Sequence, residues 1–400
     1  ALVCALFVPG AQKLHAADER PNVIIIYADD LGWGDLGCYG NPSIRTPNLD
    51  AMASHGMRFT DFYSAAEVCT PSRAALLTGR YPIRSGMCHD KFRVLRNNSL
   101  GGLPKDEQTL PALLKTKGYA TGCIGKWHLG HRPEHLPPNH GFDFYFGMPF
   151  SNDMMPAPDA PKGRAKIFEE NNDYWRTPLI RGIEVVEEKP DQRQLTRRYT
   201  EESIAFIKAH QERPFFLYLA HTFPHVPLFA SANFRGKSRG GIYGDVVEEI
   251  DWSVGRILEE LRERGLEKKT LVIFSSDNGP WTLFDNHGGS AGPLREGKGS
   301  TWEGGMRVPG IFQWSGTIPE GVVQQRMAST MDVFTTVVKL AGAELPNDRP
   351  IDGADISLIL FGKAECPAHE PFFYYRGAQL FAARLGEWKA HFITQGGYGT

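Results

Sequence analysis

A cysteine stands where a helix is expected to begin, at the start of the stretch 69–79. Pro71 suits the first helical turn, where a missing N–H costs nothing, and Gly79 suits the end of the helix. The thiol of Cys69 would lie at the positive end of the helix dipole, where we expect the backbone N–H groups to favour an anion and to lower its pKa. A lone cysteine is more often an ordinary buried or disulfide-bonded residue, so the surrounding chemistry must decide.

Oxygen-bearing side chains follow two apolar runs that are typical of buried strands. They are Asp29 and Asp30 after residues 23–28, and Asp277 and Asn278 after residues 270–275. Adjacent carboxylates raise each other's pKa unless something positive binds them. Four carboxylate and amide oxygens favour calcium or magnesium over zinc, although each Asp taken singly is more often a turn former or a helix cap.

Cationic and imidazole side chains come next to other predicted strands and loops. They are Arg73 in the helix, Lys126 and His128 after residues 119–124, His225 after residues 215–220, and Lys298 in the glycine-rich loop 288–305. Lys126 and His128 are two residues apart and would point the same way on an extended chain. Either of these two residues alone is more often a surface group than a catalytic one. Around a metal ion, however, the whole set would suit a sulfate or phosphate ester, whose transferring group must be clamped in the transition state.

Strands and helices alternate through most of the chain. The predicted strands are 23–28, 57–62, 119–124, 215–220, 270–275 and 307–314, and the predicted helices are 46–56, 69–79, 109–117, 195–210, 243–264 and 331–341. The alternation predicts an α/β fold with a mainly parallel central sheet flanked by helices. Such sheets bind ligands beyond the carboxyl ends of their strands, so the candidate residues are expected to converge on one edge.

Three segments depart from the alternation. Residues 148–190 are rich in Pro, Gly, Asn and charge and predict a long surface excursion that lines the pocket through Ser151 at its start. Residues 18–345 are predicted to form the catalytic domain. Residues 346–400 carry short strands, which predict the start of a smaller antiparallel C-terminal subdomain that we expect to be truncated at residue 400. Residues 1–17 resemble the remnant of a secretory signal peptide, for which a buried N-terminal strand is the alternative.

Composition excludes several classes of protein. The chain has 400 residues and a net charge of -2, which gives no field strong enough to favour nucleic acid or an anionic membrane. After the first residues, no stretch approaches 18 uninterrupted apolar residues, so no transmembrane anchor is expected. The six cysteines match no zinc pattern, and their spacing supports no disulfide pairing.

Several short motifs carry a family resemblance from Pro21 to about Gln395. They are the cysteine motif 69–80, Asn48-Leu-Asp50, Gly125-Lys-Trp-His-Leu-Gly130, Asp277-Asn-Gly279 and Lys389-Ala-His-Phe392. Together they resemble the sulfatase family of the alkaline phosphatase superfamily. In that family the motif cysteine is oxidised after synthesis to formylglycine. One departure is Glu296, in a loop where animal relatives often carry cysteine, which puts the contacts around it in doubt.

The resemblance implies a role for each candidate residue. Asp29, Asp30, Asp277 and Asn278 would bind calcium, with magnesium the less favoured ion, and residue 69 would join them as formylglycine. Arg73 and Lys126 would hold the aldehyde hydrate, and His128 would act as its base. Lys298 and Ser151 would bind sulfate, and His225 would protonate the leaving alcohol. His221 receives no role.

The resemblance also implies a sulfuric ester hydrolase of the arylsulfatase type. Its substrate would be a sulfated small molecule, glycan or glycolipid, and a formylglycine-generating enzyme would act on it during maturation. The secretory pathway is implied, with an extracellular, lysosomal or periplasmic destination, and a homo-oligomer is compatible with the family. Two alternatives stay open: a phosphodiesterase or phosphonate monoester hydrolase of the same superfamily, and an unmodified, non-catalytic binder of sulfated glycans.

Overall fold

The computed structural model describes residues 20–89, 93–363 and 371–394. The expected signal-peptide remnant 1–17 and the chain from residue 395 onward lie outside these residues, as do Cys4 and Cys366. Within the described ranges, no helix combines the length and apolar character needed to cross a bilayer.

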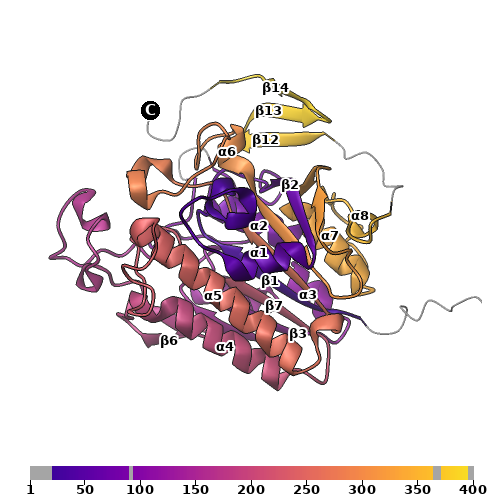
Figure 1. Ribbon diagram of the computed structural model, residues 1–400, viewed down its shortest axis with the longest axis horizontal. Helices are drawn as coiled ribbons and strands as arrows, with labels where there is room; N and C mark the ends of the chain where they lie inside the picture. The colour runs from indigo at the N-terminus through magenta and orange to yellow at the C-terminus, as the bar shows by residue number, and fades with distance from the viewer. Residues whose placement is uncertain (1–19, 90–92, 364–370, 395–400) are drawn as a thin grey trace, which may run out of the picture.

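An eleven-stranded sheet forms the centre of the molecule (Figure 1). Its order is β10-β2-β9-β8-β1-β7-β3-β4-β5-β6, with β11 beside β2. The strands are β1 (Asn22–Ala28), β2 (Met57–Tyr63), β3 (Ala120–Gly125), β4 (Phe144–Gly147), β5 (Leu179–Arg181), β6 (Glu184–Glu187), β7 (Phe215–Ala220), β8 (Thr270–Ser276), β9 (Arg307–Gln313), β10 (Val322–Gln324) and β11 (Ala328–Ser329). The central strands β8, β1, β7, β3 and β4 are parallel, whereas β9 runs antiparallel to β8 and β2. The predicted mainly parallel α/β sheet is confirmed.

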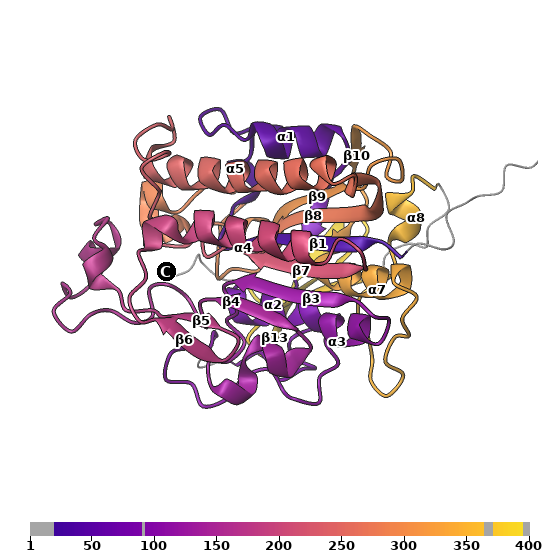
Figure 2. The same ribbon diagram turned by 90° about the horizontal axis from the view of Figure 1, so that it is seen from below.

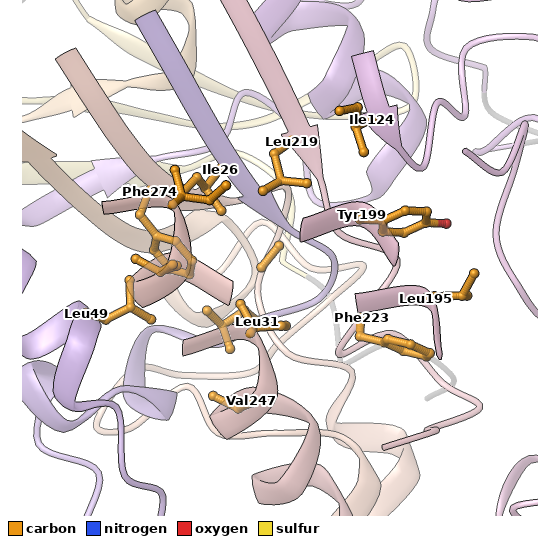
Figure 3. Close-up of a cluster of buried hydrophobic side chains, with 14 of the residues drawn as sticks. Ile26, Leu31, Leu49, Ile124, Leu195, Tyr199, Leu219, Phe223, Val247 and Phe274 are labelled. Atoms are coloured by element: carbon orange, nitrogen blue, oxygen red, sulfur yellow. The ribbon is translucent and has the colours of Figure 1, made fainter. Parts of the chain in front are cut away.

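Helices cover both faces of this sheet (Figure 2). One face carries α1 (Pro47–Ser54), α4 (Leu195–Ala209) and α5 (Gly241–Glu263), and the other carries α2 (Cys69–Thr78), α3 (Leu110–Lys115), α7 (Thr330–Leu340) and α8 (Ser357–Leu360). Side chains of β1 alternate between the two layers, because successive residues of a strand point to opposite faces. Ile24 and Ile26 pack towards α4 and α5, and Val23 and Ile25 pack towards α2 and α7. Figure 3 shows Ile26 in the first of these layers.

The segment 148–190 is only in part the surface excursion that we expected. It begins in the interior, with Ser151 and Asn152 fully buried, and it returns to the sheet as the antiparallel edge strands β5 and β6. Between these parts it projects from the molecule, at the left of Figure 1. The weak periodicity of the segment concealed β5 and β6, because strands this short show almost no alternation.

The C-terminal strands form a separate three-stranded antiparallel sheet, as predicted. They are β12 (Phe372–Arg376), β13 (Gln379–Leu385) and β14 (Trp388–His391). The sheet packs against the main domain through Phe372, whose ring centroid lies 5.3 Å from that of Tyr63 on β2. Shorter helices complete the chain: α6 (Glu303–Met306), η1 (Trp33–Asp35), η2 (Gly37–Tyr39), η3 (Pro133–His135), η4 (Pro137–His140), η5 (Ala165–Ile167), η6 (Asn172–Tyr174), η7 (Gln192–Gln194), η8 (Glu267–Lys269) and η9 (Thr282–His287).

Candidate active site

Two acidic turns leave the carboxyl edge of the sheet side by side. β1 and β8 are neighbours, and the last residue of β1, Ala28, pairs with Ser276 at the end of β8. The backbone N–H of Asp30 donates to Oδ1 of Asp277 at 3.1 Å, which locks one turn against the other. Parallel pairing of two adjacent strands therefore brings together carboxylates about 250 residues apart in the chain.

Cys69, the first residue of α2, lies at the same place. Ligand atoms of Asp29, Cys69 and Asp277 all lie within 4.8 Å of one another, and all three side chains are buried. A second group within the same distance joins Asp29 and Asp30 to His225. The structure thus brings residue 69 to the paired acidic turns, as the sequence analysis expected.

The oxygen atoms of this site fit a hard cation. Among the described residues, Oδ1 of Asp29 and Oδ1 of Asn278 are buried and accept no hydrogen bond. Leaving such acceptors unpaired in a protein interior costs free energy, which a divalent ion would recover. Carboxylate and amide oxygens are the ligands that calcium and magnesium take.

Arg73 braces the acidic turns from the helix. Its Nε and Nη2 donate to Oδ2 of Asp277 at 3.0 and 2.8 Å, and Nη2 lies 3.6 Å from Oδ1 of Asp29. Its Nη1 donates to the backbone carbonyl of Lys126 at 3.0 Å. All five guanidinium donors are fixed in one plane, so a single buried side chain holds three elements in register.

Lys126 lies between the acidic turns and the segment 148–190. Its Nζ donates to Oδ2 of Asp29 and, at 2.7 Å, to Oγ of Ser151. Oγ of Ser151 lies 3.3 Å from Nε2 of His225, which in turn lies 3.7 Å from Oδ2 of Asp30. Lysine, serine and histidine thus face the same carboxylates in a chain of polar contacts.

Lys298 completes the ring of cations from the glycine-rich loop. Its Nζ lies 2.7 and 2.8 Å from the two carboxylate oxygens of Asp30. The buried site therefore holds three carboxylates against three cationic side chains. The carboxylates belong to Asp29, Asp30 and Asp277, and the cations to Arg73, Lys126 and Lys298.

The two carboxylates nearest residue 69 have opposite pKa shifts. Burial opposes the ionisation of Asp29, but Lys126 and other neighbouring cations outweigh burial and hold its pKa below the usual range. Burial and the adjacent Asp29 carboxylate raise the pKa of Asp277 to about 7, and Arg73 opposes that rise. An added positive charge at this point would favour the ionised form of both groups.

The pKa of the Cys69 thiol differs from our expectation. Burial raises it to about 11, against the pull of Lys126 and Lys298. The prediction of a lowered pKa was wrong, because it weighed the helix dipole without the cost of desolvating a thiolate. As a plain cysteine, residue 69 would be a protonated thiol at neutral pH and a poor nucleophile.

The backbone at His128 is not extended, although the sequence analysis had assumed an extended chain. His128 has a φ of +60°, so the chain turns there and the argument that it points with Lys126 does not apply. Its Nε2 contacts the carbonyl of Leu95 at 2.8 Å, and its buried Nδ1 accepts no hydrogen bond from the described residues. Burial, with Lys126 adding to it, lowers the pKa of His128 well below its usual value. His221 is buried on the His225 loop and makes none of the site contacts given above.

Sequence analysis missed two contributors to the site. The indole ring of Trp281 lies against Lys298 and His225, and its position four residues after Asp277 was the available signal. Lys389 on β14 supports the loop that carries Lys298: its Nζ donates at 2.8 Å to both the carbonyl of Thr301 and Oε1 of Glu303. Lys389 belongs to one of the motifs that carry the family resemblance, but the sequence does not show that β14 lies next to that loop.

Replacing Lys389 by methionine is expected to lower the free energy of unfolding by about 1–2 kcal/mol. The value lies between that of an exposed ion pair and that of a fully buried one, since the side chains of Lys389 and Glu303 are 13% and 26% exposed. Urea denaturation followed by circular dichroism measures it. Lys339→Met is the matched control, because Lys339 is 51% exposed in its pair with Asp355. Equal effects of the two variants would show that β14 does not anchor the loop through this contact.

Comparison with known proteins gives consistent results along the whole chain. A family model described as Sulfatase matches residues 21–343, and a model of the C-terminal region of aryl-sulfatase matches residues 367–399. The chain is 46% identical to N-acetylgalactosamine-6-sulfatase of Canis lupus familiaris over 402 aligned residues, covering 97% of this chain and 75% of that protein. It is 45% identical to arylsulfatase A of Bos taurus, covering 95% and 76%.

A solved structure shows the same fold. The PsFucS1 sulfatase from Pseudoalteromonas sp. superposes with a TM-score of 0.84 at 32% sequence identity, covering 93% of this chain and 78% of that one. The structural similarity therefore extends over most of the chain.

Proposed function

This chain belongs to the sulfatase family and is a sulfuric ester hydrolase, and from that premise we propose that it cleaves sulfate monoesters with a formylglycine at position 69 and a bound calcium ion. The observation that carries the proposal is the common position of Cys69, Asp29 and Asp277, whose ligand atoms lie within 4.8 Å of one another in the protein interior. A cysteine placed there for disulfide bonding or for packing alone would need neither the acidic turns nor the cations around it.

We assign the calcium ion to four side chains. They are Asp29, Asp30, Asp277 and Asn278. Bound there, the ion would act as a Lewis acid on sulfate-ester oxygens. Calcium accepts irregular oxygen coordination, whereas magnesium demands a near-octahedral shell, so calcium suits ligands taken from two separate turns.

The proposed modification would replace a thiol that is a poor nucleophile, because burial raises its pKa. A maturation enzyme would convert Cys69 to formylglycine, whose hydrate offers two hydroxyls on one carbon, one to displace the alcohol from sulfur and one whose deprotonation expels sulfate. Arg73 and Lys126, which meet the carboxylates nearest residue 69, would hold the oxygens of that group. His128 is neutral because burial lowers its pKa, and its open Nδ1 suits it to take a proton.

The other end of the pocket would bind and cleave the ester. Lys298 and Ser151 would hold sulfate oxygens, and His225 would donate the proton that the leaving alcohol needs. Burial and Lys298 lower the pKa of His225, which makes its protonated form a stronger acid. Nε2 of His225 lies 3.3 Å from Oγ of Ser151, so the proton donor and a sulfate ligand are adjacent.

The mass of one peptide tests the modification. Trypsin releases residues 59–73, which contain Cys69 as their only cysteine. Conversion of the thiol to the aldehyde lowers the mass of this peptide by about 18 Da relative to unmodified cysteine. An unmodified peptide from protein that binds sulfated glycans without turnover would support the non-catalytic alternative. Faster turnover of an aryl phosphodiester than of para-nitrophenyl sulfate would support the phosphodiesterase alternative.

His225→Ala is expected to slow esters with poor leaving groups more than activated aryl esters. Loss of a general acid costs about 10²–10⁴-fold where the alcohol leaves as a strong base, and about tenfold or less for para-nitrophenolate, which leaves without a proton. Measuring kcat on a sulfated monosaccharide and on para-nitrophenyl sulfate separates the two. His221→Ala is the matched control, a buried imidazole on the same loop. Equal losses on both esters would remove His225 as the acid.

We propose sulfated carbohydrates, with glycans and glycolipids among them, as the natural substrates. The support is similarity to a protein named N-acetylgalactosamine-6-sulfatase. We further propose that the protein matures in the secretory pathway, where a formylglycine-generating enzyme would meet it. Turnover of a panel of sulfated monosaccharides, glycosaminoglycan fragments and sulfolipids tests the substrate class.

A further inference from the structure

The indole ring of Trp281 contacts both groups that we place around the scissile ester bond. Nζ of Lys298 lies 4.1 Å from the centroid of the ring, over its face. The imidazole of His225 lies 5.3 Å from the indole, centroid to centroid, with the rings inclined at 56°. Trp281 therefore stands beside both the proposed sulfate ligand and the proposed proton donor.

Trp281 differs from the groups deeper in the pocket in its exposure. Ser151 and Lys126 are 0% exposed, and His225 and Lys298 are 3% and 5% exposed. Trp281 is partly exposed, so its ring borders both the reacting groups and solvent. If Lys298 holds the sulfate and His225 protonates the leaving oxygen, the alcohol lies next to both groups, and the partly exposed indole of Trp281 contacts both.

Further aromatic rings pack against Trp281 and against one another. Phe284 meets the indole edge to face, with 4.7 Å between centroids, and lies 5.9 Å from the ring of Phe168. Phe168 belongs to the segment 148–190, and the centroid of its ring lies 5.0 Å from that of His287. We call these four residues, Trp281, Phe284, Phe168 and His287, the aromatic wall. It fixes the indole between the pocket and the projecting segment.

We infer that Trp281 determines leaving-group specificity by stacking against a ring, so that the enzyme prefers sulfate esters of phenols or pyranoses over esters of acyclic alcohols. Flat aromatic faces and the C–H faces of sugars both pack on indole, whereas a short alkyl group covers little of it. The inference rests on the proposed function, because the leaving group is placed by the roles of Lys298 and His225.

Inhibition by unreactive sulfonates tests the inference without turnover. Phenylmethanesulfonate carries a ring next to its anionic head, and methanesulfonate carries the head alone. Trp281→Leu is expected to raise the Ki of the ringed inhibitor about tenfold and to leave that of methanesulfonate within twofold, while Trp281→Phe keeps most of the preference. Trp388→Leu, which changes a tryptophan 86% exposed on β14, is the control and should alter neither value.

Two results would overturn the inference. Equal changes in both inhibition constants would mean that Trp281 only supports Lys298, and no change in either would mean that the ring does not reach the indole. With active enzyme, a fall in kcat/KM of Trp281→Leu on para-nitrophenyl sulfate or on a sulfated monosaccharide that exceeds the fall on an acyclic alkyl sulfate supports the inference and identifies the ring. Failure of the proposed function would appear separately, as wild-type protein that binds the sulfonates but turns over none of these esters.

Discussion

Cys69→Ala is expected to lower kcat for para-nitrophenyl sulfate by at least about 10⁴-fold, the scale on which loss of a covalent nucleophile acts. Alanine has no thiol and cannot be converted to the formylglycine that we propose at residue 69, whereas the carboxylates, cations and histidines of the site stay in place. The fold should persist, because the change deletes one sulfur atom from a buried position without adding volume or charge. Steady-state kinetics and thermal unfolding of the purified variant measure the two effects.

Cys123→Ala is the matched control for this experiment. Cys123 is also a free, fully buried cysteine, but it lies within β3 and faces the apolar layer of α2 and α7. Both variants should unfold at similar temperatures, and only the change at residue 69 should remove activity. Substantial turnover by Cys69→Ala, or equal losses in the two variants, would contradict the assignment.

The sequence was sufficient to predict the elements that carry the site. Buried parallel strands appear in a sequence as continuous runs of β-branched and aromatic residues, and this pattern predicts β1, β7 and β8. Because these strands are parallel, the residues that follow them meet at one edge of the sheet. The same reasoning placed Cys69 at the start of α2. These features depend on local sequence pattern and on general rules of sheet topology, so they can be predicted without knowledge of the three-dimensional structure.

The features that were missed depend on the environment of each group. The pKa of Cys69 is set by complete burial, which no local motif reports. The turn at His128 is a single left-handed residue between two glycines, and β5 and β6 are held by pairing with β4 rather than by their own pattern. Trp281 acquires its position from contacts with loops distant in sequence. Long-range packing, not propensity, decides all of these.

The charges of the buried site explain why cation and anion binding should depend on each other. With Asp277 in its ionised form, which an added positive charge favours, the three carboxylates balance Arg73, Lys126 and Lys298, so the protein groups alone give the site no net charge with which to attract sulfate. A divalent cation would make the same pocket positive by two charges. In a buried site this charge is poorly screened, so an anionic ester should bind more tightly when the ion is present.

Removal of the divalent ion is therefore expected to lower kcat/KM by about 10³-fold, since a metal ion contributes several kcal/mol of transition-state stabilisation and each 1.36 kcal/mol is tenfold. Treatment with a calcium chelator followed by exchange into chelator-free buffer gives the apo protein, and added calcium should restore the rate. Restoration by magnesium but not by calcium would reassign the ion. Full activity after verified metal removal would exclude a required cation.

Thermal unfolding of the apo protein tests the charge argument independently of catalysis. Calcium should raise Tm, and inorganic sulfate alone should raise it little. The two together should raise it by more than the sum, because the charge of the ion favours the anion and, by linkage, the anion favours the ion. Asp277→Asn removes one ligand carboxylate and should abolish both the calcium shift and the excess, whereas Asp159→Asn, at an exposed position, should preserve them. Strictly additive shifts in the wild-type protein would mean that sulfate does not sense the ion's charge, and the ion would then have to lie away from residue 69.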